Sequence, residues 1–221
     1  MKRIFTILVL LGAIATSADA AWAQTPTETL KAGLDSVLAI LQDPRYDTSQ
    51  GISEDHLDAM RNAVHQFFDF RELTKRAVGR PWTGFTDQQR NELTNVFTKL
   101  LEKTYLRKLN TEYLKELAEF KKESIVFLDE QIKGDKAMVY TRLQLTDKPL
   151  DVNFRLIERD GRWWTYDVIG EGLTLLGIYQ DEFKNILVNK TPEDLISILK
   201  EKIQAIDEKH DKTPATEAPA S

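Results

Sequence analysis

Residues 137–170 read AMVYTRLQLTDKPLDVNFRLIERDGRWWTYDVIG, and apolar residues in this stretch recur with a period of two. The alternating runs are separated by short turns at 147–149 and 160–161. A fourth run, at 125–131, precedes them across the turn residues 133–135. Runs joined by such short turns pair as neighbours in an antiparallel sheet. The stretch therefore predicts a four-stranded antiparallel meander.

The alternation also predicts which side chains share a face of this sheet. Val139 and Thr141 lie on one face, and the next run adds Val152, Phe154 and Leu156 to the same face. The residues between them are mostly polar or charged. We therefore expect one apolar face and one solvated face.

Helical periodicity flanks the predicted sheet on both sides. Apolar residues spaced three and four apart predict helices at about 30–41, 53–68, 70–78, 86–113, 173–188 and 191–206. Capping residues mark three of the helix starts: Ser53, Thr86 with Gln89, and Thr191 with Asp194. Helices grouped around one antiparallel sheet define an α+β fold.

The first 23 residues have the features of an export signal. Two basic residues follow Met1, an apolar stretch covers 4–15, and Ala21-Trp22-Ala23 offers a cleavage site. The apolar stretch is shorter than the roughly 20 residues that a membrane span requires. We expect a periplasmic mature domain over 24–207, followed by a disordered polar tail over 208–221.

Composition excludes several classes of function. The 221 residues include no cysteine, which rules out a disulfide scaffold, a thiolate metal site and a cysteine nucleophile. The 30 basic and 35 acidic residues give a net charge of −5, which argues against nucleic acid as a partner. No cofactor is expected.

Motifs for catalysis are missing from the sequence. The three histidines, at positions 56, 65 and 210, do not have the spacing of a metal site, and no nucleotide-binding or nucleophile motif occurs. Asp151 and Asp167 lie on predicted strands, and a carboxylate beside a tyrosine in an apolar cleft could act as a base. An enzyme of this kind therefore remains an alternative.

The sequence also contains more apolar faces than one small core obviously needs. The sheet offers one face, and at least five amphipathic helices each offer another. These faces could form an ordinary core, could bind only another protein, or could enclose a pocket for an apolar ligand. Composition alone does not decide between these three possibilities.

Several short motifs, in a fixed order from about residue 27 to 206, resemble one family. They are FDFRELT (68–74), AVGRPW (77–82), TDQQR (86–90), Tyr105, WTYDV (164–168), EG (171–172), Leu175, Tyr179 and Phe183. The ordered set resembles the Mla-type periplasmic phospholipid-binding proteins, also called the toluene-tolerance family.

The resemblance implies a monomeric lipid carrier without enzymatic activity. Such proteins carry phospholipids between an outer-membrane lipoprotein complex and an inner-membrane ABC transporter that bears a lipid-binding ring. Their fold joins a helical part to a curved, cone-like sheet, with an apolar cavity between them. Some relatives occur beside hopanoid biosynthesis, so a polycyclic lipid is an alternative cargo. The chain departs from the family pattern at Leu173-Thr174 and at Gln180, and Gln180 puts in doubt any headgroup or partner contact that an arginine there would make.

A carrier of this kind needs an apolar enclosure, because each buried methylene is worth about 0.8 kcal/mol. Two sixteen-carbon chains therefore represent roughly 25 kcal/mol of transfer free energy. The residues expected to line the enclosure are apolar or aromatic: Phe70, Leu73, Val78, Phe97, Leu100, Tyr105, Val139, Val152, Phe154, Tyr166, Val168, Leu176 and Tyr179.

Overall fold

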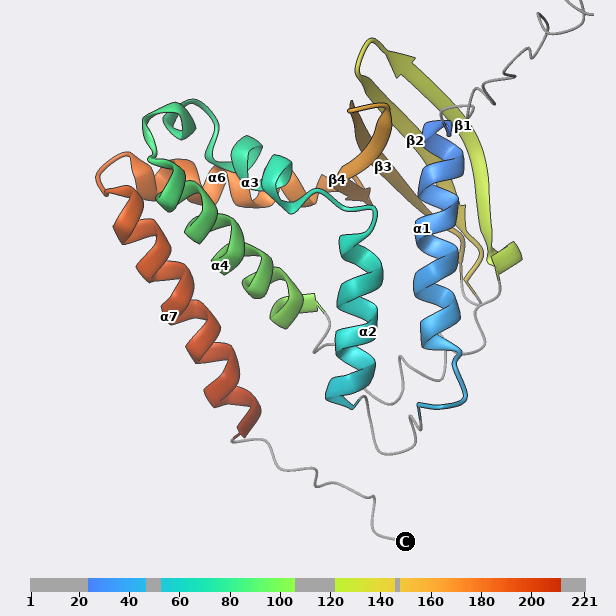
Figure 1. Ribbon diagram of the computed structural model, residues 1–221, viewed down its shortest axis with the longest axis horizontal. Helices are drawn as coiled ribbons and strands as arrows, with labels where there is room; N and C mark the ends of the chain where they lie inside the picture. The colour runs from blue at the N-terminus through green and yellow to red at the C-terminus, as the bar shows by residue number, and fades with distance from the viewer. Residues whose placement is uncertain (1–23, 47–52, 106–121, 146–147, 212–221) are drawn as a thin grey trace, which may run out of the picture.

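The computed structural model describes residues 24–46, 53–105, 122–145 and 148–211. It is an α+β fold in which helices precede and follow one antiparallel sheet (Figure 1). The helices are α1 (Pro26–Leu41), α2 (Glu54–His65), α3 (Phe70–Val78), α4 (Asp87–Tyr105), α6 (Leu175–Leu187) and α7 (Pro192–Asp211), with short 3-10 turns η1 (Arg80–Gly84) and η3 (Lys122–Ser124). The strands are β1 (Ile125–Lys133), β2 (Lys136–Leu143), β3 (Leu150–Arg159), β4 (Arg162–Gly170) and β5 (Leu173–Thr174).

The predicted capping residues begin the helices where the sequence placed them. The hydroxyl of Ser53 accepts a hydrogen bond from the backbone N–H of His56 at 3.2 Å. Reciprocal bonds close the capping boxes of Thr86 with Gln89 and of Thr191 with Asp194. These side chains satisfy backbone donors that the first helical turn leaves without partners.

The sheet has five strands in the order β1-β2-β3-β4-β5, so the prediction of four strands was wrong by one. Glu171 and Gly172 both have positive φ, 50° and 80°, which makes a tight turn that folds β5 back onto β4. Thr174 is extended, and its hydroxyl accepts from the Gly177 N–H at 2.6 Å. Because Thr174 is the cap, the helix predicted from Leu173 begins at Leu175 instead.

Two other predicted boundaries need comment. Helix α7 continues through Asp211, so the tail predicted from residue 208 begins at least four residues too early. The described part of α4 ends at Tyr105. The rest of the helix predicted to 113, the export signal at 1–23 and the final residues 212–221 lie outside the described residues.

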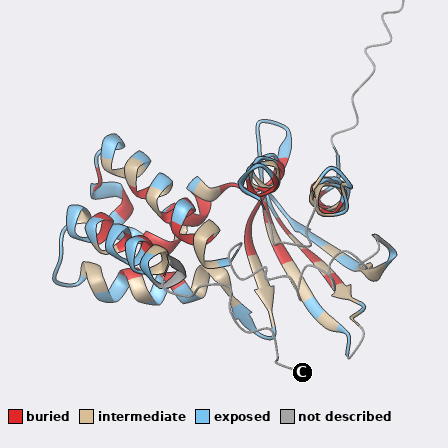
Figure 2. Ribbon diagram, turned by 90° about the horizontal axis from the view of Figure 1, so that it is seen from below, coloured by how far each residue is buried: buried red, intermediate tan, exposed pale blue. Residues whose placement is uncertain are grey.

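Two separate hydrophobic clusters hold the fold together. Helices α3, α4, α6 and α7 pack on one another around Phe97 and Phe183, beside the sheet (Figure 1). Helix α1 covers the apolar face of the sheet, where Leu30, Val139 and Leu156 are fully buried. Figure 2 shows the same division, with one group of buried residues among the helices and another on the strands beneath α1 and α2.

Helix α2 joins the two parts. It packs on α1, and Phe67, two residues after α2, lies so close to α1 that a Cβ added at Gly33 would overlap its ring. The segment after α2 then runs beside β4: Thr165 donates to the Phe67 carbonyl at 2.8 Å, and Asp69 donates to the Thr165 carbonyl at 2.7 Å. This parallel bridge fixes Phe67 and Phe68 against the sheet. Among the described residues, no helix combines the length and the apolar character needed to cross a bilayer.

Candidate functional site

An apolar pocket of about 230 Å³ lies where the two hydrophobic clusters meet. Its walls come from α2, the segment after α2, the start of α3, the end of α4, β3, β4 and the start of α6. The lining residues are mostly apolar: Arg61, Val64, His65, Phe67, Phe68, Phe70, Leu101, Glu102, Tyr105, Phe154, Val168 and Leu175. A pocket with this lining favours hydrocarbon over water.

Aromatic rings form much of one wall. The rings of Phe68 and Phe70 are tilted against each other with centroids 4.8 Å apart, and His65 lies 4.8 Å from Phe70. Phe154 and Val168 face each other across β3 and β4 and form the opposite, sheet side. Val168 packs against both hydrophobic clusters, which places the pocket at their boundary.

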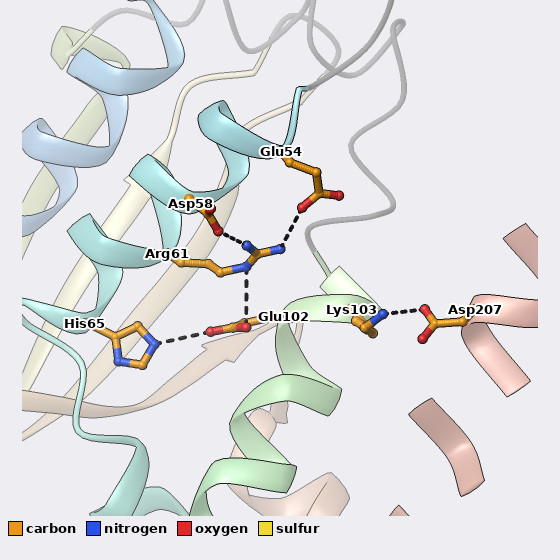
Figure 3. A network of polar contacts seen from close by, with 7 residues as sticks. All are labelled: Glu54, Asp58, Arg61, His65, Glu102, Lys103 and Asp207. Carbon is orange, nitrogen blue, oxygen red and sulfur yellow. Dashed lines mark hydrogen bonds and ion pairs between the residues drawn. The ribbon is translucent and has the colours of Figure 1, made fainter. Parts of the chain in front are cut away.

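A network of charged side chains borders this pocket between α2 and α4 (Figure 3). Arg61 lies 3.4 Å from the Glu102 carboxylate, and His65 Nε2 lies 3.2 Å from the same group. Arg61 also pairs with Glu54, at 3.6 Å, and with Asp58. One guanidinium thus meets three carboxylates, and these polar contacts link α2 to α4.

A second, polar cleft of about 760 Å³ lies on the other side of this network. Arg61, His65, Phe68, Phe70 and Glu102 line both cavities, so the two are adjacent. The remaining residues of the cleft are largely polar: Glu54, Leu57, Asp69, Arg71, Thr94, Asn95, Thr98, Lys99, Lys103, Arg159 and Trp164. An apolar chamber therefore adjoins a wide polar vestibule.

The structure brings four of the predicted lining residues to the apolar pocket: Phe70, Tyr105, Phe154 and Val168. Six others belong to the helical cluster: Leu73, Val78, Phe97, Leu100, Leu176 and Tyr179. Tyr179 packs edge-on to Phe97 with ring centroids 4.7 Å apart, and burial raises the pKa of its hydroxyl. Val139 and Val152 pack in the cluster beneath α1.

Tyr166 lies outside the pocket for a different reason. The β3–β4 register shifts between Arg155 and Leu156, so Tyr166 is the extra residue of a β-bulge. It lines a shallow depression with Met138, Tyr140 and Arg155, and the guanidinium of Arg76 lies 4.2 Å from its ring centroid. Simple alternation cannot foresee a bulge, because one extra residue changes which face each side chain occupies.

The two carboxylates considered as catalytic bases have other partners. Asp167 is fully buried, accepts from the Leu176 N–H at 2.9 Å and pairs with Arg155 at 2.9 Å. Burial is the main cause that raises the pKa of Asp167. Asp151 is exposed, and its hydrogen bond from Arg142 lowers its pKa. Neither carboxylate lines the apolar pocket.

Sequence reasoning missed much of the pocket lining. Val64, Phe67 and Phe68 fall on the apolar stripe of the helix predicted at 53–68, and that stripe does not indicate that they line a cavity. Arg61, His65 and Glu102 gave no signal, because charged residues on helices are usually solvated. Only the packing of α2 beside α4 brings them together.

Comparison with known proteins agrees with this architecture. The pattern of the MlaC protein family matches residues 31–201. Among solved structures, a phospholipid-binding protein from Ralstonia solanacearum, determined in complex with a phospholipid, superposes with a TM-score of 0.71. The two are 20% identical, and the match covers 83% of this chain and 99% of that one, which shows a common fold. Because the family pattern spans most of the sequence, this chain belongs to the MlaC protein family.

Proposed function

We propose that this protein is a carrier that holds the acyl chains of a phospholipid in the apolar pocket. The observation that supports the proposal is the position of that pocket, which lies between two separately packed clusters and opens beside a polar cleft. Tails and headgroup of a lipid need these two environments side by side. The phospholipid bound by the Ralstonia solanacearum protein of the same fold adds support.

The volume of the pocket limits how a lipid can be held. About 230 Å³ is smaller than the roughly 300–1,000 Å³ of ordinary small-molecule pockets. Two long acyl chains therefore require the walls to move apart. The boundary between the clusters is where this movement disturbs the fewest packed side chains, because each cluster keeps its own contacts.

We further propose a periplasmic route between two membrane complexes. In this scheme the carrier exchanges phospholipid with an outer-membrane lipoprotein complex and with an inner-membrane ABC transporter that bears a lipid-binding ring. Membership of the MlaC family and the export-type N-terminus support this scheme. The carrier itself acts without chemistry on its cargo, since transport requires only burial and release of the tails.

Native mass spectrometry of protein purified from bacterial periplasm tests the proposal. We expect a mass increase that matches one phospholipid, and solvent extraction should return that lipid unchanged. A polycyclic lipid in the extract would replace the phospholipid as cargo, and a chemically altered lipid would indicate an enzyme. Protein that emerges empty and takes no lipid from phospholipid vesicles would contradict the carrier function.

A further inference from the structure

The boundary between α2 and α4 is the least firmly packed side of the apolar pocket. In the described part of the chain, α2 packs closely on α1, whereas α4 packs closely on α3 and α7. The pair α2 and α4 is not among the closely packed pairs of helices there. Other walls are held by backbone pairing, since Phe154 and Val168 lie on neighbouring strands and a parallel bridge fixes Phe68 against β4. The pocket can therefore widen between α2 and α4 with the loss of few packing contacts.

Glu102 spans this boundary from the side of α4. Its carboxylate lies 3.4 Å from Arg61 Nε and 3.2 Å from His65 Nε2, and both partners belong to α2 (Figure 3). All three residues line the apolar pocket and the polar cleft alike. They form a partition between the two cavities, and acyl chains that enter the pocket from the cleft must cross it.

Arg61 also has two acidic partners on its own helix. Glu54 lies 3.6 Å from its guanidinium, and Asp58 contacts it directly. The side chains of Glu54 and Asp58 are 78% and 62% exposed, whereas that of Glu102 is 18% exposed. If α4 moves away, Arg61 keeps both partners on α2, and Glu102 becomes hydrated. Breaking a buried ion pair is costly because it strands a charge, and here no charge is stranded.

We infer that Arg61 and Glu102 form a releasable latch, whose opening sets the rate at which acyl chains enter and leave the apolar pocket. This inference rests on the proposed carrier function and adds the device that closes the same pocket. The contact is loose, because Arg61 Nε is buried and makes no hydrogen bond with any residue that the structure describes. A half-exposed ion pair shifts an equilibrium by only about two- to fivefold, so the latch slows exchange without preventing it.

The test measures how fast bound lipid leaves the protein. Protein loaded with pyrene-labelled phosphatidylcholine is mixed with an excess of unlabelled phosphatidylcholine vesicles, and stopped-flow fluorescence follows the transfer. These vesicles carry no net charge, so a change in the charge of the protein has little effect on its approach to them. Glu102→Gln keeps the size of the side chain but removes its charge, and it should release lipid about threefold faster than wild type.

A double variant, Glu54→Gln with Asp58→Asn, should change the rate in the opposite direction. Arg61 then has Glu102 as its remaining acidic partner among the described residues, so opening separates the pair without compensation. We expect release about threefold slower than wild type. A general effect of lost negative charge or lost stability would change both variants in the same direction, so opposite shifts identify competition for Arg61.

Each variant has a matched control on the same helix. Glu92→Gln removes a carboxylate of α4 that pairs with Lys200 at 2.7 Å, and Asp55→Asn removes an exposed carboxylate from the first turn of α2. Neither position lines the two cavities, so both controls should release lipid at the wild-type rate. Thermal melts check that every variant is folded. Glu102→Asp, which withdraws the carboxylate by one methylene, is a second latch variant and should also release lipid faster.

The contrary results have separate meanings. If Glu102→Gln and Glu102→Asp release lipid no faster than Glu92→Gln, the latch is overturned and the carrier function stands. A double variant that releases lipid as fast as Asp55→Asn, or faster, would overturn the role of Glu54 and Asp58 in freeing Arg61. Failure of wild type to take up the labelled lipid at all would refute the carrier function, and this inference with it.

Discussion

Val139 and Phe154 are direct partners across β2 and β3, yet the structure gives them different surroundings, so an aspartate at each should have a different effect. Val139 is fully buried beneath α1. Its replacement removes roughly 1.5–3 kcal/mol of apolar burial and strands a carboxylate without a partner, at a further cost of several kcal/mol. Because domains are stable by only about 5–15 kcal/mol, we expect Val139→Asp to be unfolded or insoluble.

Phe154 faces the apolar pocket instead, where about 230 Å³ can admit several water molecules of roughly 30 Å³ each. The carboxylate of Phe154→Asp is then partly hydrated, and the loss of the ring costs about 3 kcal/mol. For a chain of this size we expect a melting temperature lower by about 6–12 °C, with the fold retained. Lipid content should fall about tenfold, because the charge opposes the acyl chains.

Circular dichroism melts and lipid extracted per mole of protein measure the two effects. Phe154→Leu and Val139→Ala are the matched controls, and both should remain folded with near-normal lipid content. A folded Val139→Asp protein that lacks lipid would show that Val139 also lines the cavity, as the sequence alone suggested. An unfolded Phe154→Asp protein, or one with a full lipid load, would refute the placement of the pocket.

Three further predictions concern the packing, a buried charge and the N-terminus. Gly33→Ala should lower the free energy of unfolding, measured with urea, by about 1–3 kcal/mol, because the added methyl group overlaps Phe67. The control Gly84→Ala adds a methyl group in open space and should change this free energy by less than about 0.5 kcal/mol. Burial raises the pKa of Asp167 above its unfolded value, so this carboxyl ionises less readily in the native state. Its contribution to the free energy of unfolding therefore falls as pH rises from about 4 through the native pKa. Urea unfolding should therefore show Asp167→Asn gaining on wild type across this range, and a constant difference would contradict the burial argument. Intact-mass measurement of the periplasmic form should find Gln24 as the first residue, and retained Met1 would remove the argument for export.

The sequence predicted the strands well because a half-buried antiparallel sheet leaves a period of two in its residues. The two-residue strand β5 was missed because it is too short to show a period, and the Glu171-Gly172 turn before it was not predicted either. The site was harder to predict. Val139 and Phe154 share a face, and only the positions of α1 and α2 above the sheet decide that one is packed and the other borders the pocket.

Contacts between residues that are far apart in the sequence could not be predicted, because they leave no periodic pattern in it. His65 and Glu102 are 37 positions apart and meet only because α2 and α4 flank the same cavity. Tyr166 illustrates the opposite error. It was predicted to line the apolar enclosure, but the β-bulge changes the face of the sheet on which its side chain lies. Periodicity therefore identifies candidate apolar faces, while tertiary packing decides which of them remain available to a ligand.

Val168 contacts both hydrophobic clusters and the cavity between them, so bound acyl chains would act as a removable third part of the core. A ligand that binds only the native state stabilises it by RT ln(1 + [L]/Kd), which is about 2.7 kcal/mol at a hundredfold excess over Kd. Loaded and empty forms of the proposed carrier would therefore differ in resistance to heat and to proteases. In the proposed periplasmic setting, proteases would remove empty molecules first, and the cellular level of this protein would then follow the supply of its cargo.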